Sequence, residues 1–345
     1  MGTVIFRADG GGVYSVAMGH VFRTVRLAKV LAQRGTDCHF VMKDYLEGVR
    51  FVQEAGFPIY KINPHLSDQQ AAELTVVFAK ERKGVIFIDL RSSVTELVNT
   101  SNGESVPNIV YEDVCRKDIR PTILINPTPI AEDEEGYRGR EGQKFFLGID
   151  YQVLDPDLQR YARESFQAKI NDLFLCFGGA DPCNISSRVL SLLLELKGDF
   201  KITLALGPAF AFHDTVKEVL KSKDNDHRVT LFSNCKELHE IHGKADCAIT
   251  AGGTIVYESV SLNIPTLVLP SIDYEANNMS PLIDMGLIDG LREDVANVPD
   301  DILEENIRSF IANEEKRFEL FNNSIEHKLI GGTQRVIDKI CSTLK

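Results

Sequence analysis

The sequence predicts an α/β fold made of two Rossmann-like, doubly wound domains that face each other across a cleft. A chain of 345 residues is long enough for two domains of ordinary size. Short apolar runs alternate with stretches of helical spacing, and this series occurs twice along the chain. Most of the short runs are apolar throughout, as in the strands of a parallel sheet that is covered on both faces.

The elements of the first series follow from local patterns. Residues 20–34 carry Val21, Val25, Ala28 and Leu31 at helical spacing, and this pattern ends at Gly35. The strands are predicted at residues 4–8, 38–42, 58–61, 85–89, 108–111 and 122–125, and the helices at residues 20–34, 45–55 and 68–82. Residues 127–142 are rich in Pro, Gly and charged side chains, which predicts an exposed loop.

The second series follows a helix predicted at residues 155–169. Its strands are predicted at residues 173–177, 201–206, 228–232, 247–250 and 266–269, and its helices at residues 185–196, 214–223, 237–243, 256–262 and 276–285. Residues 302–313 and 315–344 have the pattern of closing helices. We therefore expect an N-terminal domain over residues 1–153, a C-terminal domain over residues 170–314 and a closing C-terminal helix over residues 315–345.

Composition argues against several classes of protein. A net charge of −12 disfavours nucleic acid as a partner, because binding there depends on neutralising phosphates. No apolar run reaches the roughly 18 residues of a membrane span, and the N-terminus lacks the pattern of a signal peptide. The seven cysteines include no Cys-x-x-Cys pair, which indicates free thiols in a reducing compartment. We expect a cytoplasmic protein without a membrane span.

The loop after the first strand is the first candidate site. Glycines at positions 10–12 let the backbone approach a ligand closely, and Gly19 and His20 fall at the start of the next helix. His20 either acts as a general base near neutral pH or caps the helix, and spacing alone favours neither. The loop lacks the Gly-x-Gly-x-x-Gly pattern, which argues against a dinucleotide site.

Three further candidate loops follow strands of the second series. In the second loop, Gly178 and Gly179 precede Asp181 and Asn184 at a helix start, a pattern that fits a phosphate-binding loop. For Asp181 itself, helix capping is favoured over catalysis. The third loop comprises Ala251, Gly252, Gly253 and Thr254, and its amides at a helix N-terminus suit a diphosphate. Glu258 lies one turn further on and either accepts the hydroxyls of a ribose or is a solvated side chain. The fourth loop contains Glu275, in a position suited to sugar hydroxyls or to capping.

We expect no metal and no cofactor. His239 and His242 resemble half of a zinc motif, but they lie three residues apart instead of the four found in zincins.

Taken together, these motifs resemble a known family. Arg7-Ala8-Asp9 followed by Gly19-His20 and Arg23 resembles the opening of the UDP-sugar hydrolases of pseudaminic acid biosynthesis (PseG) and of the related spore coat polysaccharide proteins (SpsG). The glycine loop at residues 177–184 is similar to that of the family's second domain. Residues 251–254 with Glu258 are similar to a nucleotide loop shared with MurG-type glycosyltransferases, and residues 331–336 resemble the closing segment of longer spore coat members.

The resemblance implies a GT-B architecture and a metal-independent hydrolysis of a UDP-linked amino or deoxy sugar, in the synthesis of a nonulosonic acid or a surface polysaccharide. It implies that His20 activates water, that Asp9 and Arg23 orient the sugar or the histidine, and that Glu258 holds the ribose. The other residues expected to bind the UDP-sugar are Gly19, Gly178, Gly179, Asp181, Asn184, Ala251, Gly252, Gly253, Thr254 and Glu275.

The chain also departs from the hydrolases. Leu90 and Arg91 stand in place of a His-Tyr pair after the strand that ends at Asp89, and Glu275 stands in place of a Gln. The main alternative is therefore a GT-B glycosyltransferase that uses a UDP-sugar donor. A third hypothesis is a protein that binds a UDP-sugar without turning it over.

Overall fold

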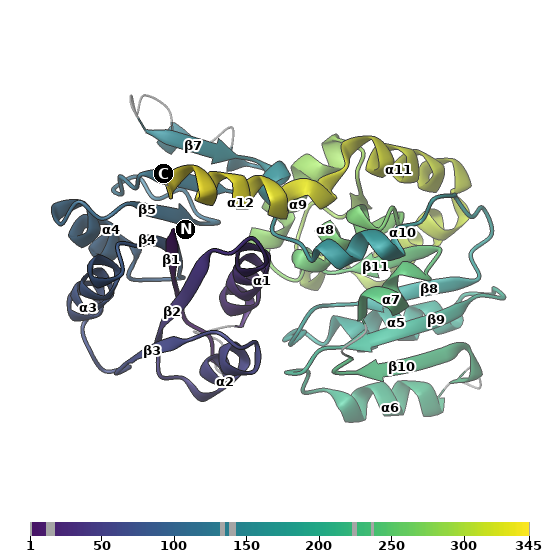
Figure 1. The fold of residues 1–345 in the computed structure, drawn as a ribbon. Coiled ribbons are helices and arrows are strands. Elements are labelled where there is room, and N and C mark those ends of the chain that lie inside the picture. Colours follow the sequence, from purple (N-terminus) through teal and green to yellow (C-terminus); the bar gives the residue numbers. More distant parts are fainter. Residues whose placement is uncertain are drawn as a thin grey trace. The chain divides into compact units, whose positions relative to one another are not determined.

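The chain folds into two units in the computed structural model, which describes residues 2–11, 18–131, 135–137, 143–222, 226–235 and 238–344. Unit 1 comprises Met1–Asp155 and Gly331–Lys345, and unit 2 comprises Pro156–Ile330. Each unit is built around one sheet whose described strand pairs are all parallel (Figure 1). The two Rossmann-like α/β units predicted from the sequence are thus confirmed.

The sheet of unit 1 has the strand order β3-β2-β1-β4-β5-β6-β7. Its strands are β1 (Thr3–Ala8), β2 (Asp37–Lys43), β3 (Ile59–Ile62), β4 (Val85–Asp89), β5 (Asn108–Tyr111), β6 (Ile123–Asn126) and β7 (Lys144–Leu147). Its helices are α1 (Gly19–Gln33), α2 (Leu46–Glu54), α3 (Asp68–Glu81), α4 (Val94–Gly103) and α12 (Gly332–Thr343). Part of the loop predicted at residues 127–142 lies outside the described residues.

Helix α4 and strand β7 are missing from the sequence prediction. The sequence of α4 is rich in Val, Thr, Ser and Asn, which have modest helix propensity. In the structure Leu97 and Val98 are buried, and α4 lies against α3. Tertiary packing therefore stabilises a helix that the local sequence only weakly favours.

The core of unit 1 lies on both faces of its sheet. Side chains of β1 alternate between the faces, as in any strand: Phe6 packs in the cluster that includes residues of α1 and α12, whereas Ile5 packs in the cluster that includes residues of α3 and α4. Both side chains are fully buried. The same alternation continues along β4, where Phe87 joins the first cluster and Ile88 the second.

The closing C-terminal helix predicted at residues 315–345 is wrong as a single element. The structure has α11 (Glu314–His327) in unit 2 and α12 (Gly332–Thr343) in unit 1. The chain leaves α11 at Lys328, which adopts the left-handed conformation with φ 54°. Gly332 then starts α12 so close to Gln152 that a Cβ would lie 2.1 Å from the Gln152 carbonyl oxygen, so only glycine fits there.

The sheet of unit 2 has the strand order β10-β9-β8-β11-β12-β13. Its strands are β8 (Asp172–Cys176), β9 (Lys201–Leu206), β10 (Val229–Ser233), β11 (Cys247–Thr250), β12 (Thr266–Val268) and β13 (Asp289–Gly290). Its helices are α5 (Ile185–Glu195), α6 (His213–Ser222), α7 (Leu238–Gly243), α8 (Thr254–Ser261), α9 (Asp273–Asp284), α10 (Asp300–Ala312) and α11. Residue 223 of the predicted helix 214–223 and residue 237 of the predicted helix 237–243 lie outside the described residues.

The helix predicted at residues 155–169 is also wrong. Only a short 3-10 helix forms, at Pro156–Tyr161. Beyond it, the Arg163 amide donates to the Leu262 carbonyl at 2.9 Å, and the Arg163 guanidinium donates to Asp246 at 2.8 Å. These contacts to distant residues replace the hydrogen bonds of the helix.

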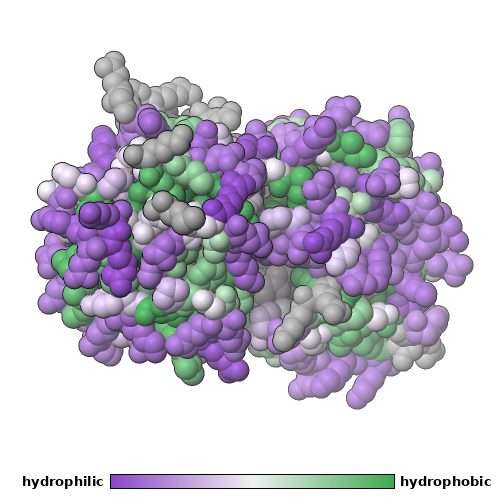
Figure 2. All heavy atoms as spheres, viewed as in Figure 1, coloured by the Kyte–Doolittle hydropathy of each residue, from purple (hydrophilic) through white to green (hydrophobic). Residues whose placement is uncertain are grey.

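Polar side chains dominate the face of each unit seen in Figure 2, and apolar side chains form smaller groups among them. Among the described helices, none has the length and hydrophobicity that crossing a bilayer requires. All seven cysteines belong to the described part of the chain and are free thiols.

Candidate active site

Unit 1 has a candidate site where its strand order reverses. The chain runs from β1 to β2 and β3 on one side and then returns to form β4 on the other side of β1. In parallel α/β sheets, ligands bind beyond the carboxyl ends of the strands at such a switch point. Ala8 at the end of β1 pairs with Asp89 at the end of β4, and α1 begins with Gly19 and His20. Residues 12–17 of the intervening glycine loop lie outside the described residues.

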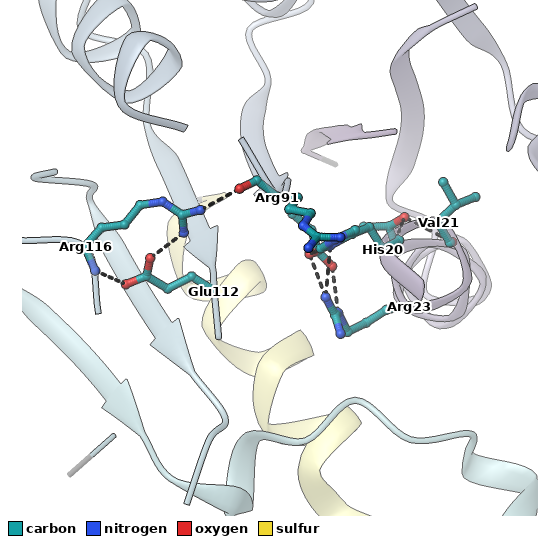
Figure 3. A network of polar contacts seen from close by, with 8 residues as sticks. His20, Val21, Arg23, Arg91, Glu112 and Arg116 are labelled. Carbon is teal, nitrogen blue, oxygen red and sulfur yellow. Dashed lines mark hydrogen bonds and ion pairs between the residues drawn. The ribbon is translucent and has the colours of Figure 1, made fainter. Parts of the chain in front are cut away.

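His20, Arg23 and Asp89 form one hydrogen-bonded cluster (Figure 3). The Nδ1 atom of His20 lies 2.7 Å from Oδ1 of Asp89. Arg23 donates to both carboxylate oxygens, from Nε to Oδ2 and from Nη2 to Oδ1, each at 2.7 Å. His20 and Arg23 lie three residues apart on α1 and therefore share a face of the helix. Helical spacing thus brings both side chains to the end of β4.

The buried Asp89 is a carboxylate. Its side chain is 1% exposed, and burial raises the pKa of the carboxyl group, but the charge and hydrogen bonds of Arg23, together with His20, outweigh burial and hold this pKa below its ordinary value. A carboxylate accepts hydrogen bonds and donates none, so Nδ1 of His20 donates to it. In neutral His20 the proton therefore resides on Nδ1, and Nε2 keeps the lone pair that a general base requires.

Asp9 connects two strand ends of unit 1. Its Oδ1 accepts from the Arg7 guanidinium at 2.6 Å and from the Lys43 backbone amide at 2.7 Å. Asp9 thereby joins the ends of β1 and β2. In the structure, the residue that orients His20 is Asp89. Local sequence patterns do not mark Asp89 as a site residue.

Unit 2 has a candidate site of its own, at the switch point of its sheet. Here β8 lies between β9 and β11, and Cys176 at the end of β8 pairs with Thr250 at the end of β11. The loops that begin with Gly178 and Ala251 therefore leave neighbouring strands at the same level. The Ala251 amide also donates to the Cys176 carbonyl at 3.3 Å, which fixes the two strand ends together.

The loop after β8 is a helix cap built on glycines. Gly178 has φ +79°, which favours glycine, and Gly179 approaches Gly207 so closely that a Cβ on Gly207 would lie 2.3 Å from the Gly179 Cα. The Asp181 carboxylate accepts from the amides of Ile185 and Ser186 at the start of α5, at 2.9 and 2.8 Å. These contacts fit the capping interpretation of Asp181.

Asn184 immediately precedes α5 in the left-handed conformation, with φ 52°. Its Oδ1 accepts from the Ser187 hydroxyl at 2.6 Å, so the Asn184 side chain also forms a hydrogen bond within the first turn of α5.

The loop after β11 contacts the loop after β12 through Glu275. One carboxylate oxygen of Glu275 accepts from the Gly252 amide at 3.1 Å and from the Ser271 amide at 2.7 Å. Gly252 is so close to Glu275 that an added Cβ would lie 2.7 Å from the Glu275 Cβ. The next residues, Gly253 and Thr254, form the N-terminus of α8, where backbone amides lack partners within the helix.

Glu258 lies one turn into α8 and is 7% exposed. Its carboxylate oxygen lies 3.6 Å from Nε2 of His239. A buried carboxylate next to a helix N-terminus is a strong acceptor for a pair of hydroxyl groups.

His239 and His242 do not form a metal site together. His242 is fully buried, its Nε2 lies 3.0 Å from the Ser259 hydroxyl, and its ring stacks on Phe174 with the centroids 4.2 Å apart. Burial lowers the pKa of His242 to about 4. The described residues include no group of three or more His, Cys, Asp or Glu side chains placed to hold a metal ion.

Comparisons of sequence place these features among known proteins. No family model matches the chain. It is 24% identical over 284 residues to the spore coat polysaccharide biosynthesis protein SpsG of Bacillus subtilis, covering 81% of this chain and 80% of SpsG. It is 24% identical over 267 residues to a UDP-2,4-diacetamido-2,4,6-trideoxy-beta-L-altropyranose hydrolase of Campylobacter jejuni, covering 75% of this chain and 88% of the hydrolase. The resemblance to SpsG and PseG is therefore confirmed.

A third relative is longer than this chain. The uncharacterised protein MJ1062 of Methanocaldococcus jannaschii is 26% identical over 269 residues, which are 75% of this chain and only 54% of that protein. The chain therefore matches about half of the length of this relative.

Comparisons of structure identify the fold. MurG of Acinetobacter baumannii superposes with a TM-score of 0.72 at 14% identity, covering 99% of this chain and 100% of MurG. The calicheamicin glycosyltransferase CalG4 gives a TM-score of 0.65 at 14% identity, covering 99% of this chain and 98% of CalG4. A co-structure of S. aureus MnaA with UDP gives a TM-score of 0.65 at 13% identity, covering 99% of this chain and 96% of the MnaA chain. The chain has the GT-B fold.

Proposed function

We propose that this chain is an enzyme that hydrolyses a UDP-linked amino or deoxy sugar to UDP and the free sugar, without a metal, in the synthesis of a nonulosonic acid or of a surface polysaccharide. The observation that carries the proposal is the His20–Asp89 pair at the switch point of unit 1, which presents an oriented imidazole base. The similarity to SpsG and to the Campylobacter hydrolase supports the class of substrate.

In this proposal unit 2 binds the nucleotide. The amides of Gly253 and Thr254 at the start of α8 stabilise the diphosphate, because a helix N-terminus presents free N–H groups and a positive dipole end. Glu258 accepts hydrogen bonds from the ribose hydroxyls. Gly252 and Glu275, which are hydrogen-bonded to each other, hold the loops after β11 and β12 in place for the nucleotide.

Unit 1 supplies the base. Nε2 of His20 removes a proton from water as the water oxygen forms a bond to the anomeric carbon of the sugar. The bond between that carbon and the phosphate oxygen breaks, and its electron pair leaves with UDP. Asp89 holds the imidazole through Nδ1 and stabilises the imidazolium that forms, and Arg23 holds Asp89 in its ionised state.

The main alternative is a glycosyltransferase that uses the same donor. The structural similarity to MurG and CalG4 favours it as the second hypothesis. In a transferase, the base that we assign to His20 deprotonates an acceptor hydroxyl instead of water. The two activities differ in one measurable property, because only a hydrolase releases UDP when no acceptor is present.

The test is UDP release from a panel of UDP-linked amino and deoxy sugars, without acceptor and with EDTA present. We expect turnover in the wild type and its loss in His20→Ala. The control is His65→Ala, an exposed histidine of the same unit, which we expect to keep wild-type turnover. UDP binding without release across the whole panel would refute hydrolysis and favour the transferase. Release that persists in His20→Ala would remove the proposed base, and release that is lost with EDTA would refute metal independence.

A further inference from the structure

The guanidinium of Arg23 is held from two directions. Its nitrogens donate to both oxygens of the Asp89 carboxylate, each at 2.7 Å. Its planar face lies over the ring of Tyr111, with Cζ 4.7 Å from the ring centroid, a distance at which a cation is attracted to an aromatic face. Asp89 in turn accepts from Nδ1 of His20 at 2.7 Å. Tyr111 is therefore separated from the proposed base by only two side chains.

Tyr111 is itself fixed at its ring and at its hydroxyl. It is the last residue of β5, it is 2% exposed, and its ring belongs to the core cluster that includes residues of α1 and α12. Burial raises the pKa of its hydroxyl above the ordinary value, so the hydroxyl keeps its proton and donates to the Tyr151 carbonyl at 3.1 Å. The same oxygen accepts from the Val153 amide at 3.4 Å. The ring beneath Arg23 is thus anchored to the backbone of residues 151–153.

Residues 150–155 are the segment through which the chain leaves unit 1, because unit 2 begins at the next residue. The segment is also bonded to the start of α12, with which the chain returns to unit 1: the Thr333 hydroxyl donates to the Leu154 carbonyl. Helix α1 reaches the segment a second time, because Nε of Arg26 lies 3.8 Å from the Asp155 carboxylate. The helix that carries the proposed base is therefore tied to this segment.

We propose that Tyr111 is a positioning residue for the base. It holds Arg23 against Asp89. Through its hydroxyl, it makes the orientation of His20 depend on residues 151–153. This inference rests on the proposed function, which assigns the base to His20, and adds a residue to that mechanism. Tyr111 acts through the two side chains between it and the imidazole, and small displacements of a catalytic group change the rate strongly.

The first experiment is nitrogen-15 NMR of the ligand-free protein, under conditions in which the imidazole is neutral. It identifies the ring nitrogen of His20 that carries the proton, and His20→Ala assigns the signals. Tyr111→Phe keeps the ring beneath Arg23 and removes both hydrogen bonds of the hydroxyl. We expect the proton to reside on Nδ1 in the wild type and the fraction on Nε2 to rise in Tyr111→Phe. The control is Tyr60→Phe, a tyrosine of β3 that is 38% exposed, which should change nothing.

The same variant separates catalysis from nucleotide binding. We expect Tyr111→Phe to lower kcat for UDP release by about tenfold, because the base is less well oriented. The Kd of UDP should stay unchanged, because we assign UDP binding to unit 2.

The second experiment perturbs the segment from its other side. Thr333→Val keeps the size of the side chain and removes the hydroxyl that bonds to Leu154. We expect it to shift the nitrogen signals of His20 when Tyr111 is present and to leave them unshifted in the Tyr111→Phe background. Such a double-mutant cycle measures the coupling itself and needs no substrate.

Two results would overturn the inference. If the proton of His20 stays on Nδ1 to the same extent in Tyr111→Phe as in the wild type, Tyr111 has a structural role only, even where urea denaturation shows a loss of stability. If Thr333→Val has the same effect on His20 with and without the Tyr111 hydroxyl, or no effect in either background, the orientation of the base does not depend on the segment through Tyr111. A wild type that releases UDP from no sugar would refute the proposed function, and the NMR comparison would still decide the inference.

Discussion

Asp89→Asn tests the central feature of the proposed mechanism. The substitution keeps the shape of the side chain and removes its charge. An asparagine amide can donate to Nδ1 of His20, which moves the ring proton to Nε2 and removes the lone pair that acts as the base. The equivalent change in a Ser-His-Asp triad lowers kcat by about 10⁴. We therefore expect kcat for UDP release to fall by about 10² to 10⁴, while UDP affinity, assigned to unit 2, changes little.

The same substitution has a cost in stability that follows from the contacts of Arg23. Its guanidinium loses the carboxylate that both of its hydrogen bonds reach, and its side chain is only 23% exposed. Breaking a buried ion pair costs about 3–5 kcal/mol. Because Arg23 is partly accessible to water, the cost for the Arg23–Asp89 pair should lie near the lower end of this range. Urea denaturation should therefore show a loss of about 3 kcal/mol in the free energy of unfolding.

The control for both measurements is Asp338→Asn. Asp338 is 60% exposed and forms an exposed ion pair with Arg34, so its loss should change stability by less than about 1 kcal/mol and leave turnover intact. Assays run below the unfolding transition separate lost activity from lost fold. A folded Asp89→Asn protein with wild-type kcat would refute the assignment of Asp89 as the residue that orients the base.

Three further predictions concern unit 2. Glu258→Gln should weaken UDP binding by about 1–3 kcal/mol in calorimetry, because a charged acceptor of the ribose hydroxyls is lost; unchanged affinity would exclude Glu258 from the site. The pKa of His242 is about 4 in the folded protein and about 6.5 in the unfolded chain. As the pH falls, His242 therefore takes up a proton in the unfolded state at a higher pH than in the folded state. The free energy of unfolding should therefore decrease by about 3 kcal/mol between pH 6.5 and 4, and His242→Phe should remove this component in urea titrations. Asp181→Ala removes the acceptor of two amides of α5 and should cost about 1–2 kcal/mol in stability; loss of UDP affinity without loss of stability would instead assign Asp181 to the ligand.

The fold could be predicted from the sequence because parallel strands have a strong local signal. Strands such as β4 are apolar up to their last residue, since both of their faces are buried. The errors lie where distant contacts decide the local structure. Residues 162–171 do not continue a helix because Arg163 bonds to Asp246 and Leu262, and Gly332 starts a new helix because it packs against Gln152.

The candidate site, too, depends on contacts between residues that are distant in the sequence, which local patterns do not predict. The sequence marks His20 as a candidate because a glycine loop, a helix start and a histidine coincide within a few residues. Its partner Asp89 lies 69 residues further along the chain, and the two meet only because β4 pairs with β1 instead of with β3. The acid at the end of β4 is visible in the sequence, but local patterns do not give the order of strands in a sheet. The family resemblance gives the orientation of the sugar or the histidine to Asp9 and Arg23. In the structure Arg23 binds Asp89 beside His20, and Asp9 joins β1 to β2.

The two switch points use different kinds of groups, and this difference supports the division of roles in the proposal. At the end of β1 the site is made of titratable side chains, His20 and Asp89, as proton transfer requires. At the ends of β8 and β11 the loops present glycines and helix N-termini, as binding of a diphosphate requires, and Glu258 supplies the acceptor that we assign to the ribose. A consequence is that His20→Ala should lower kcat while leaving the Kd of UDP almost unchanged, whereas Glu258→Gln should raise that Kd. If His20→Ala instead weakened UDP binding as much as turnover, the base and the nucleotide would share one set of residues, and the assignment of one role to each unit would be wrong.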